Sequence, residues 1–138
     1  MAPVPYYAYA RAQATTSSQA ELAVLLYRGA VRFAAKARIQ LSSRDLEGTH
    51  KSLLRAQEVL VELMIGFKPG SDQFSQDLFG LHNYIYERLY EANIRKDVAP
   101  LDEALRHLRE LLETWESISL PPSARPAAAS VVSIDRHC

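Results

Sequence analysis

The chain has 138 residues, of which 48% are hydrophobic and 23% are charged, as is ordinary for one soluble globular domain. Sixteen Lys and Arg residues balance sixteen Asp and Glu residues, so the formal net charge is zero. This balance leaves no global electrostatic case for nucleic acid or an anionic membrane surface as the main partner.

Residues 1–17 are rich in Ala, Tyr and Thr and contain two prolines, so we expect a flexible N-terminal arm. The arm has no basic stretch followed by an apolar run, which a secretory signal peptide would require. Nowhere does the chain approach the roughly 18 uninterrupted apolar residues of a membrane-spanning helix. The single cysteine, Cys138, has no partner for an intramolecular disulfide. We therefore expect a cytoplasmic protein, in the cytosol, that does not insert into a membrane.

Helical periodicity begins after the arm, and the first two predicted helices cover residues 18–41 and 44–67. Ser18 and Glu21 form a capping box at the first start, because the serine oxygen accepts from the first turn while the glutamate reaches back. Ser43 is the expected N-cap of the second helix. A proline followed by a glycine ends that helix, since proline cannot continue the hydrogen-bond ladder.

Two further helices are predicted over residues 73–96 and 98–119. Ser71 or Asp72 is expected to cap the third helix, and Asp97 the fourth. Both positions precede renewed helical periodicity, and these side chains accept hydrogen bonds from N–H groups of the first turn.

The loops between the four segments contain only a few residues, which favours antiparallel neighbours. No segment shows the sustained alternation of a β-strand. The sequence therefore predicts an all-α fold, an antiparallel up-down four-helix bundle over residues 18–119. Residues 120–138 carry three prolines amid Ser and Ala and are expected to form a disordered tail.

The first helix carries more apolar surface than one bundle can use. At about 100° per residue, its apolar side chains form two stripes on nearly opposite sides. The stripes consist of Leu22, Leu25, Leu26, Gly29 and Phe33 on one side, and Val24, Tyr27, Val31 and Ala34 on the other. A wide core face is one explanation. Because one helix cannot turn two opposite stripes into a single core, we favour a second stripe that another surface covers.

The second and third helices carry a weaker excess of apolar residues. Leu54, Val61 and Ile65 flank the core stripe of the second helix, and Phe79, Tyr86 and Tyr90 form an aromatic shoulder on the third. Edge packing explains these residues equally well, because it leaves tyrosine hydroxyls in water. The expected core residues of the last three helices are Leu46, Leu53, Leu60, Met64, Leu78, Leu81, Ile85, Leu89, Ala92, Leu101, Leu105, Leu108, Leu112 and Trp115.

A covering surface for the extra stripe can come from the chain's own flanks, from a second copy or from a different protein. Three tyrosines of the arm, Tyr6, Tyr7 and Tyr9, could supply a cover from the same chain.

One short motif has the spacing of a metal ligand pair. Glu47 and His50 form a Glu-x-x-His motif, which di-iron bundles use twice together with two further glutamates. The sequence has no second copy of the motif, and it has no glycine-rich phosphate loop or nucleophile elbow. Cys138 lacks the fixed base that a catalytic thiolate needs. We expect no enzyme activity, no metal and no cofactor.

Several short motifs follow one another between residues 9 and 119. They are Tyr9, the cap Thr16-Ser17-Ser18-Gln19, Leu26-Tyr27-Arg28-Gly29, Arg55-Ala56-Gln57, Asn83-Tyr84-Ile85-Tyr86, Arg88-Leu89, Ala92-Asn93, Asp97 and Trp115. In order and spacing they resemble the FliS family of flagellar export chaperones. Ser17, Gln19 and Arg28 depart from the family pattern, which commonly has alanine, proline, and an acidic residue or asparagine at these positions.

The resemblance implies a cytoplasmic four-helix protein that binds the disordered C-terminal segment of flagellin. Such a chaperone prevents premature polymerisation and hands flagellin to the flagellar type III export apparatus. The resemblance also implies that the partner forms helices on the chaperone, and that the N-terminal segment occupies part of the apolar surface when the partner is absent. This agrees with a helix-in-groove mode of recognition.

We therefore expect flagellin to contact the second stripe of the first helix and the aromatic shoulder of the third. The expected contact residues are Val24, Tyr27, Val31, Tyr86 and Tyr90, with Asn93 offering its amide to the partner's backbone. Tyr9 and Tyr6 are the expected displaceable cover. Each contact residue could instead pack within the bundle. The alternative function is a self-associating bundle whose extra stripe forms a homodimer interface.

Overall fold

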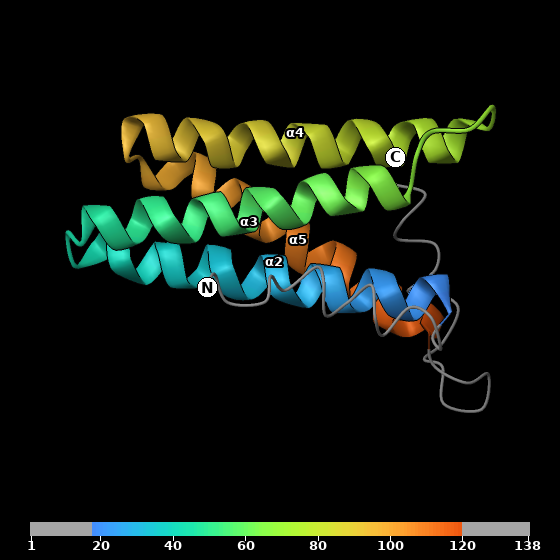
Figure 1. Cartoon of the computed structure of the whole chain (residues 1–138), viewed down its shortest axis with the longest axis horizontal. Helices are drawn as coiled ribbons and strands as arrows, with labels where there is room; N and C mark the ends of the chain where they lie inside the picture. Colours follow the sequence, from blue (N-terminus) through green and yellow to red (C-terminus); the bar gives the residue numbers. More distant parts are fainter. Residues whose placement is uncertain (1–17, 120–138) are drawn as a thin grey trace, which may run out of the picture.

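A computed structural model of the chain describes residues 18–119, which form four helices (Figure 1). They are α2 (Gln19–Ser42), α3 (Leu46–Gly66), α4 (Gln73–Arg95) and α5 (Val98–Ser119). The predicted all-α fold is confirmed, and each helix lies close to its predicted limits. The expected arm and tail, residues 1–17 and 120–138, lie outside the described part of the chain.

Consecutive helices run in opposite directions, and α5 returns to pack against α2 (Figure 1). Each helix thus contacts its two neighbours in the order α2, α3, α4, α5, and α2 lies diagonally across the bundle from α4. The connections cover residues 43–45, 67–72 and 96–97. Connections this short hold successive helices side by side, which produces the up-down topology.

Three predicted helix starts are confirmed at the level of the cap. The Ser18 hydroxyl accepts from the Glu21 N–H at 3.1 Å, and the Glu21 carboxylate accepts from the Ser18 N–H at 2.8 Å. Asp72 caps α4 by accepting from the Ser75 N–H at 2.9 Å. Asp97 accepts from the N–H two residues on, at 3.1 Å, at the start of α5. These caps satisfy N–H groups that have no partner within their own helix.

The predicted N-cap of α3 is wrong, because Ser43 is the C-cap of α2. Arg44 follows in a left-handed conformation (φ 66°), which turns the chain before a new helix begins. Asp45 is the cap of α3 and accepts from the Gly48 N–H at 2.9 Å. A side chain at position 48 would force the Asp45 carboxylate and the Gln40 amide of α2 to shift, so glycine lets both side chains keep these positions.

The buried stripe of α2 is made mainly of small residues. Its centre consists of Ala23, Tyr27, Ala30, Ala34, Ala37 and Leu41. Tyr27 and Ala34 of this line belong to the predicted second stripe. Val24 and Val31 flank the line on one side, and the predicted first stripe flanks it on the other. Alanine allows α3 and α5 to approach α2 closely from both sides, and the buried arc of α2 is correspondingly wide. The prediction of an exposed second stripe on α2 is wrong for this reason.

In the other helices, most predicted core residues are buried. Leu53, Leu60, Ile85, Leu89, Leu101 and Leu108 are all fully buried. Leu46 is half-exposed, so its assignment to the core is wrong: it is the first residue of α3, where the helix has just entered the bundle. Met64, Leu81 and Leu112 are partly buried at the edge of the core.

Aromatic rings fill one end of the core. The Trp115 ring lies 5.3 Å from the Phe67 ring and 6.3 Å from the Tyr27 ring, measured between centroids. The Tyr27 ring in turn lies 5.7 Å from the imidazole of His82. These four residues come from all four helices or their ends, so they join the bundle across both diagonals.

Candidate functional site

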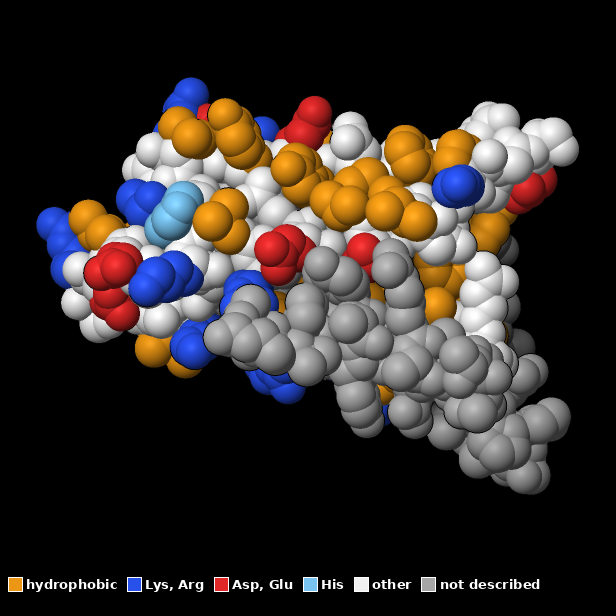
Figure 2. Space-filling model, viewed as in Figure 1, with side chains coloured by type: hydrophobic (Ala, Val, Ile, Leu, Met, Phe, Trp, Pro, Cys, Tyr) orange, Lys and Arg blue, Asp and Glu red, His pale blue; other side chains and the backbone are white. Residues whose placement is uncertain are grey.

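An exposed apolar strip follows the junction of α3 and α4, and orange side chains gather over these two helices in Figure 2. From α3, Leu54, Val61 and Ile65 are 44%, 38% and 49% exposed. From α4, Tyr90 is 54% exposed and Tyr86 is partly buried. We call these five residues the α3–α4 groove. The sequence predicted an apolar excess on each helix, and the fold brings the two together on one face.

The middle of the α3–α4 groove is hollow. Leu54, Gln57, Glu58, Val61 and Tyr86 line an open cavity of about 200 Å³. Tyr86 forms one wall from α4, while the other four residues belong to successive turns of α3. An apolar side chain of a partner would lose its contact with water here and pack against apolar atoms from both helices.

Gln57 adds an unused hydrogen-bond acceptor to this cavity. The side chain is buried, and its Oε1 atom has no hydrogen-bond partner within residues 18–119. Leaving such an acceptor unpaired is costly, whereas a donor from a bound chain would satisfy it. Sequence reasoning missed Gln57 as a functional residue. The available signal was a polar residue beside the predicted core stripe of this helix.

The predicted role of Asn93 as an amide offered to the partner does not fit its contacts. Its side chain is buried, and Nδ2 lies 2.9 Å from Nδ1 of His50. Its Oδ1 accepts from Nζ of Lys96 at 2.8 Å, and its main-chain carbonyl accepts from the same Nζ at 2.6 Å. The amide thus links α3 to the end of α4.

The other predicted contact residues of α2 also lie inside the bundle. Val24 is 6% exposed and Tyr27 is 0% exposed, so neither side chain forms an outer surface. Val31 is partly buried against the core. Val24 and Val31 share the side of α2 that carries Arg28 and Arg38, and these arginines pair with α5. The α2 residues therefore do not adjoin the α3–α4 groove.

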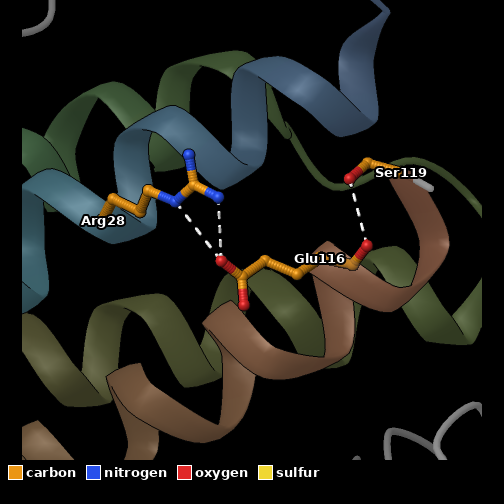
Figure 3. Close-up of polar contacts among 3 residues, drawn as sticks. All are labelled: Arg28, Glu116 and Ser119. Atoms are coloured by element: carbon orange, nitrogen blue, oxygen red, sulfur yellow. Dashed lines mark hydrogen bonds and ion pairs between the residues drawn. The ribbon is translucent and has the colours of Figure 1, made fainter. Parts of the chain in front are cut away.

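Arg28, which departs from the family pattern, connects α2 to α5 (Figure 3). Its Nε and Nη2 atoms donate to one carboxylate oxygen of Glu116, at 3.3 Å and 3.0 Å. The Glu116 carbonyl accepts from the Ser119 hydroxyl at 3.2 Å. Both members of the pair are exposed, so its contribution to stability is about 1 kcal/mol or less. The Arg28 side chain thus links the exposed side of α2 to α5.

Two further apolar residues extend the exposed surface of α4 and α3. Ile94 is 65% exposed and lies one turn beyond Tyr90, and the misassigned Leu46 begins α3 at the same end of the bundle. Ile94 was not predicted as a functional residue. The signal was an isoleucine opposite the core stripe of its own helix. Tyr6 and Tyr9, the expected cover, lie outside the described residues.

Burial determines the protonation of the histidine in the core. It lowers the pKa of His82 from 6.5 to about 4, so the ring is neutral at pH 7. On the surface, the hydrogen bond to Glu103 raises the pKa of the Tyr84 hydroxyl.

Within residues 18–119, no cluster of three or more His, Cys, Asp or Glu side chains could hold a metal ion. None of the four described helices is long and apolar enough to cross a membrane.

A four-helix bundle with an open apolar groove between two of its helices presents a surface that suits a helix of another polypeptide. The model of the family described as "Flagellar protein FliS" matches residues 1–122, and the chain belongs to this family.

Curated relatives agree with this assignment. The chain is 28% identical over 112 residues to the flagellar secretion chaperone FliS of Bacillus subtilis, covering 81% of this chain and 84% of that protein. It is 27% identical over 110 residues to the protein of the same name from Escherichia coli, covering 78% and 81%. It is 28% identical over 109 residues to that of Salmonella typhimurium, covering 75% and 78%.

Proposed function

We propose that this chain is a cytosolic export chaperone that binds the C-terminal segment of flagellin. In this role it prevents premature polymerisation of flagellin and hands it to the flagellar type III export apparatus. Membership of the FliS family supports the chaperone role. The observation that carries the binding proposal is the exposed apolar α3–α4 groove, because exposed surface of this kind marks interaction sites in soluble proteins.

The groove suits an amphipathic helix of the partner. Leu54, Val61 and Ile65 recur at spacings of seven and four residues and so form one line along α3. Tyr86 and Tyr90 form a parallel line on α4. Complete burial of one Leu, Ile or Val side chain stabilises a complex by about 1.5–3 kcal/mol before the cost of ordering the partner. A few such anchors are enough to retain an otherwise disordered segment.

Gln57 gives the groove a polar contact at its centre. We propose that its Oε1 accepts a hydrogen bond from an N–H or hydroxyl group of the bound segment. The buried position and the lack of a partner within the described residues support this role. One satisfied acceptor in an apolar cavity fixes the register of a bound helix, because a shifted helix leaves that acceptor unpaired.

We also propose that Tyr6 and Tyr9 cover part of the apolar surface when flagellin is absent. The two tyrosines and flagellin would then compete for the same surface. The apparent affinity for flagellin would be the intrinsic affinity multiplied by the fraction of chaperone whose surface is uncovered.

The decisive experiment compares two flagellins by calorimetry with the full chain. Flagellin with its C-terminal segment should bind, and flagellin lacking that segment should not. Equal binding of both would refute the proposed segment. Sedimentation of the chaperone alone tests the alternative function: a tight homodimer that ignores flagellin would mean that the groove is a self-association surface.

A further inference from the structure

A second cavity lies at the end of the bundle where α2 joins α3 and α4 joins α5. Its volume is about 360 Å³, and its lining includes Arg38, Leu41, Arg44, Lys96, Asp97 and Val98. None of these residues belongs to the α3–α4 groove. We propose that this end cavity binds a carboxylate of an acidic segment in a partner polypeptide. The inference does not depend on flagellin being the occupant of the groove.

The charge of the lining matches a single carboxylate. Arg38 is already neutralised, because its Nε donates to the Asp102 carboxylate at 2.7 Å. Arg44 makes no ion pair with any residue between 18 and 119, and Lys96 donates only to neutral oxygens of Asn93. Asp97 is the acidic residue of the lining. Two uncompensated cations and one carboxylate leave one net positive charge.

The backbone at both cations is unusual. Arg44 has a φ of 66° and Lys96 has a φ of 51°, and these are the two non-glycine residues with positive φ in the described chain. Glycine adopts this conformation without the steric cost that a side chain brings. The two residues come from different loops, yet both line the same cavity. A shared ligand for the two side chains accounts for a cation at both positions.

The neighbouring helix ends favour a carboxylate over a phosphate. α2 and α4 end at this cavity, and helix C-termini carry partial negative charge. The starts of α3 and α5 offer N–H groups, but Asp45 and Asp97 already accept from them. A dianionic phosphate would therefore meet Asp97 and two carbonyl ends, which oppose its double negative charge more strongly than the single charge of a carboxylate. Lysine and arginine side chains pair with a singly charged carboxylate by charge-assisted hydrogen bonds.

The test is an NMR titration of the isotope-labelled full chain with an acetylated, amidated hexaglutamate peptide. We expect amide shifts confined to residues around Arg44, Lys96 and Val98. Arg44→Gly should weaken peptide binding at least fivefold without lowering the urea midpoint, because glycine relieves the left-handed backbone. Lys68→Gly is the matched control, since it removes an exposed loop cation at the opposite end of the bundle. It should leave peptide binding unchanged.

Several results would overturn the inference. Shifts that are absent or spread over the whole surface would mean that the end cavity is no binding site. If Arg44→Gly and Lys68→Gly weaken peptide binding equally, the peptide responds to the net charge of the protein and not to the end cavity. A stronger response to inorganic phosphate than to the peptide would identify a small-anion site instead.

Discussion

The hydroxyl oxygen of Tyr27 lies 2.6 Å from Nε2 of His82, and this hydrogen bond crosses the core diagonally from α2 to α4. Both side chains are fully buried. His82 is neutral at pH 7, and its Nδ1 atom has no partner within residues 18–119. The bond thus gives the buried imidazole a hydrogen-bond partner, and it places Tyr27 in the structural core.

The first prediction concerns acid stability. Because burial holds the pKa of His82 near 4 in the folded state against 6.5 when exposed, the unfolded chain binds the extra proton between these values. The stability from neutral His82 is therefore complete above about pH 6.5 and is lost as the pH falls toward 4. Between pH 7.5 and pH 5 we expect a loss of about 2 kcal/mol from this group. Urea unfolding followed by the fluorescence of Trp115, the single tryptophan, measures this loss.

His82→Phe is the control. In this variant the free energy of unfolding should fall less over the same pH step. An identical pH dependence in both proteins would mean that His82 does not cause the loss.

The second prediction separates a core role from a surface role for Tyr27. Tyr27→Phe removes the hydroxyl and leaves Nε2 of His82 without its partner. We expect a loss of about 1–3 kcal/mol in the free energy of unfolding. The affinity of the folded protein for flagellin should stay within twofold of the original. Weaker binding at unchanged stability would instead return Tyr27 to the binding surface.

The third prediction tests the α3–α4 groove. Val61→Asp places a charge among apolar groove residues, so the affinity for flagellin should fall at least tenfold, or about 1.4 kcal/mol. Stability should change by no more than about 0.5–1 kcal/mol, because Val61 is already 38% exposed. Ile39→Asp is the matched control, since Ile39 is 69% exposed on α2. Similar losses of affinity in the two variants would show that the effect is not specific to the groove.

The fourth prediction concerns Gln57. Gln57→Leu removes an unpaired buried acceptor, so the free energy of unfolding should stay the same or rise by about 1 kcal/mol. Calorimetry should show affinity for flagellin reduced severalfold, because the partner's donor would then be left unpaired. If affinity rises together with stability, Gln57 does not contact the bound segment.

The fifth prediction tests the cover formed by Tyr6 and Tyr9. Deletion of residues 1–12 should tighten flagellin binding by the inverse of the open fraction, or expose enough apolar surface to cause self-association. Calorimetry and sedimentation together distinguish these results. A truncated protein that stays monomeric and binds with unchanged affinity would mean that the tyrosines cover nothing.

Local signals in the sequence predicted the elements well. Ser18, Asp72 and Asp97 are caps in the structure because a helix start depends on a few adjacent residues. Ser43 failed for an equally local reason: the left-handed Arg44 moves the start of α3 to the next acidic residue, Asp45. An arginine gives little indication of positive φ, so this turn had no clear sequence signal.

The apolar excess was predicted with mixed success. On α3 and α4 most of the surplus residues are exposed as expected, whereas Phe79 and Tyr86 are partly buried. On α2 the prediction left out Ala23, Ala30 and Ala37, so Tyr27 and Ala34 were assigned to a separate second stripe although they lie in the core. Small residues mark a close helix contact rather than a polar face, and a helix with two close neighbours buries a wide arc.

By itself, the sequence determined that the chain forms four amphipathic helices, where most of them start, and that two of them carry more apolar residues than their core stripes need. These properties follow from hydrogen-bond ladders, caps and periodicity, which act within a few residues. Only the tertiary structure decided which faces meet. Helical periodicity gives the directions of side chains around the axis of one helix. Whether the faces of two helices adjoin depends on how the four helix axes pack together. The packing joins Val61 to Tyr86 in one groove and turns Val24 and Tyr27 inward.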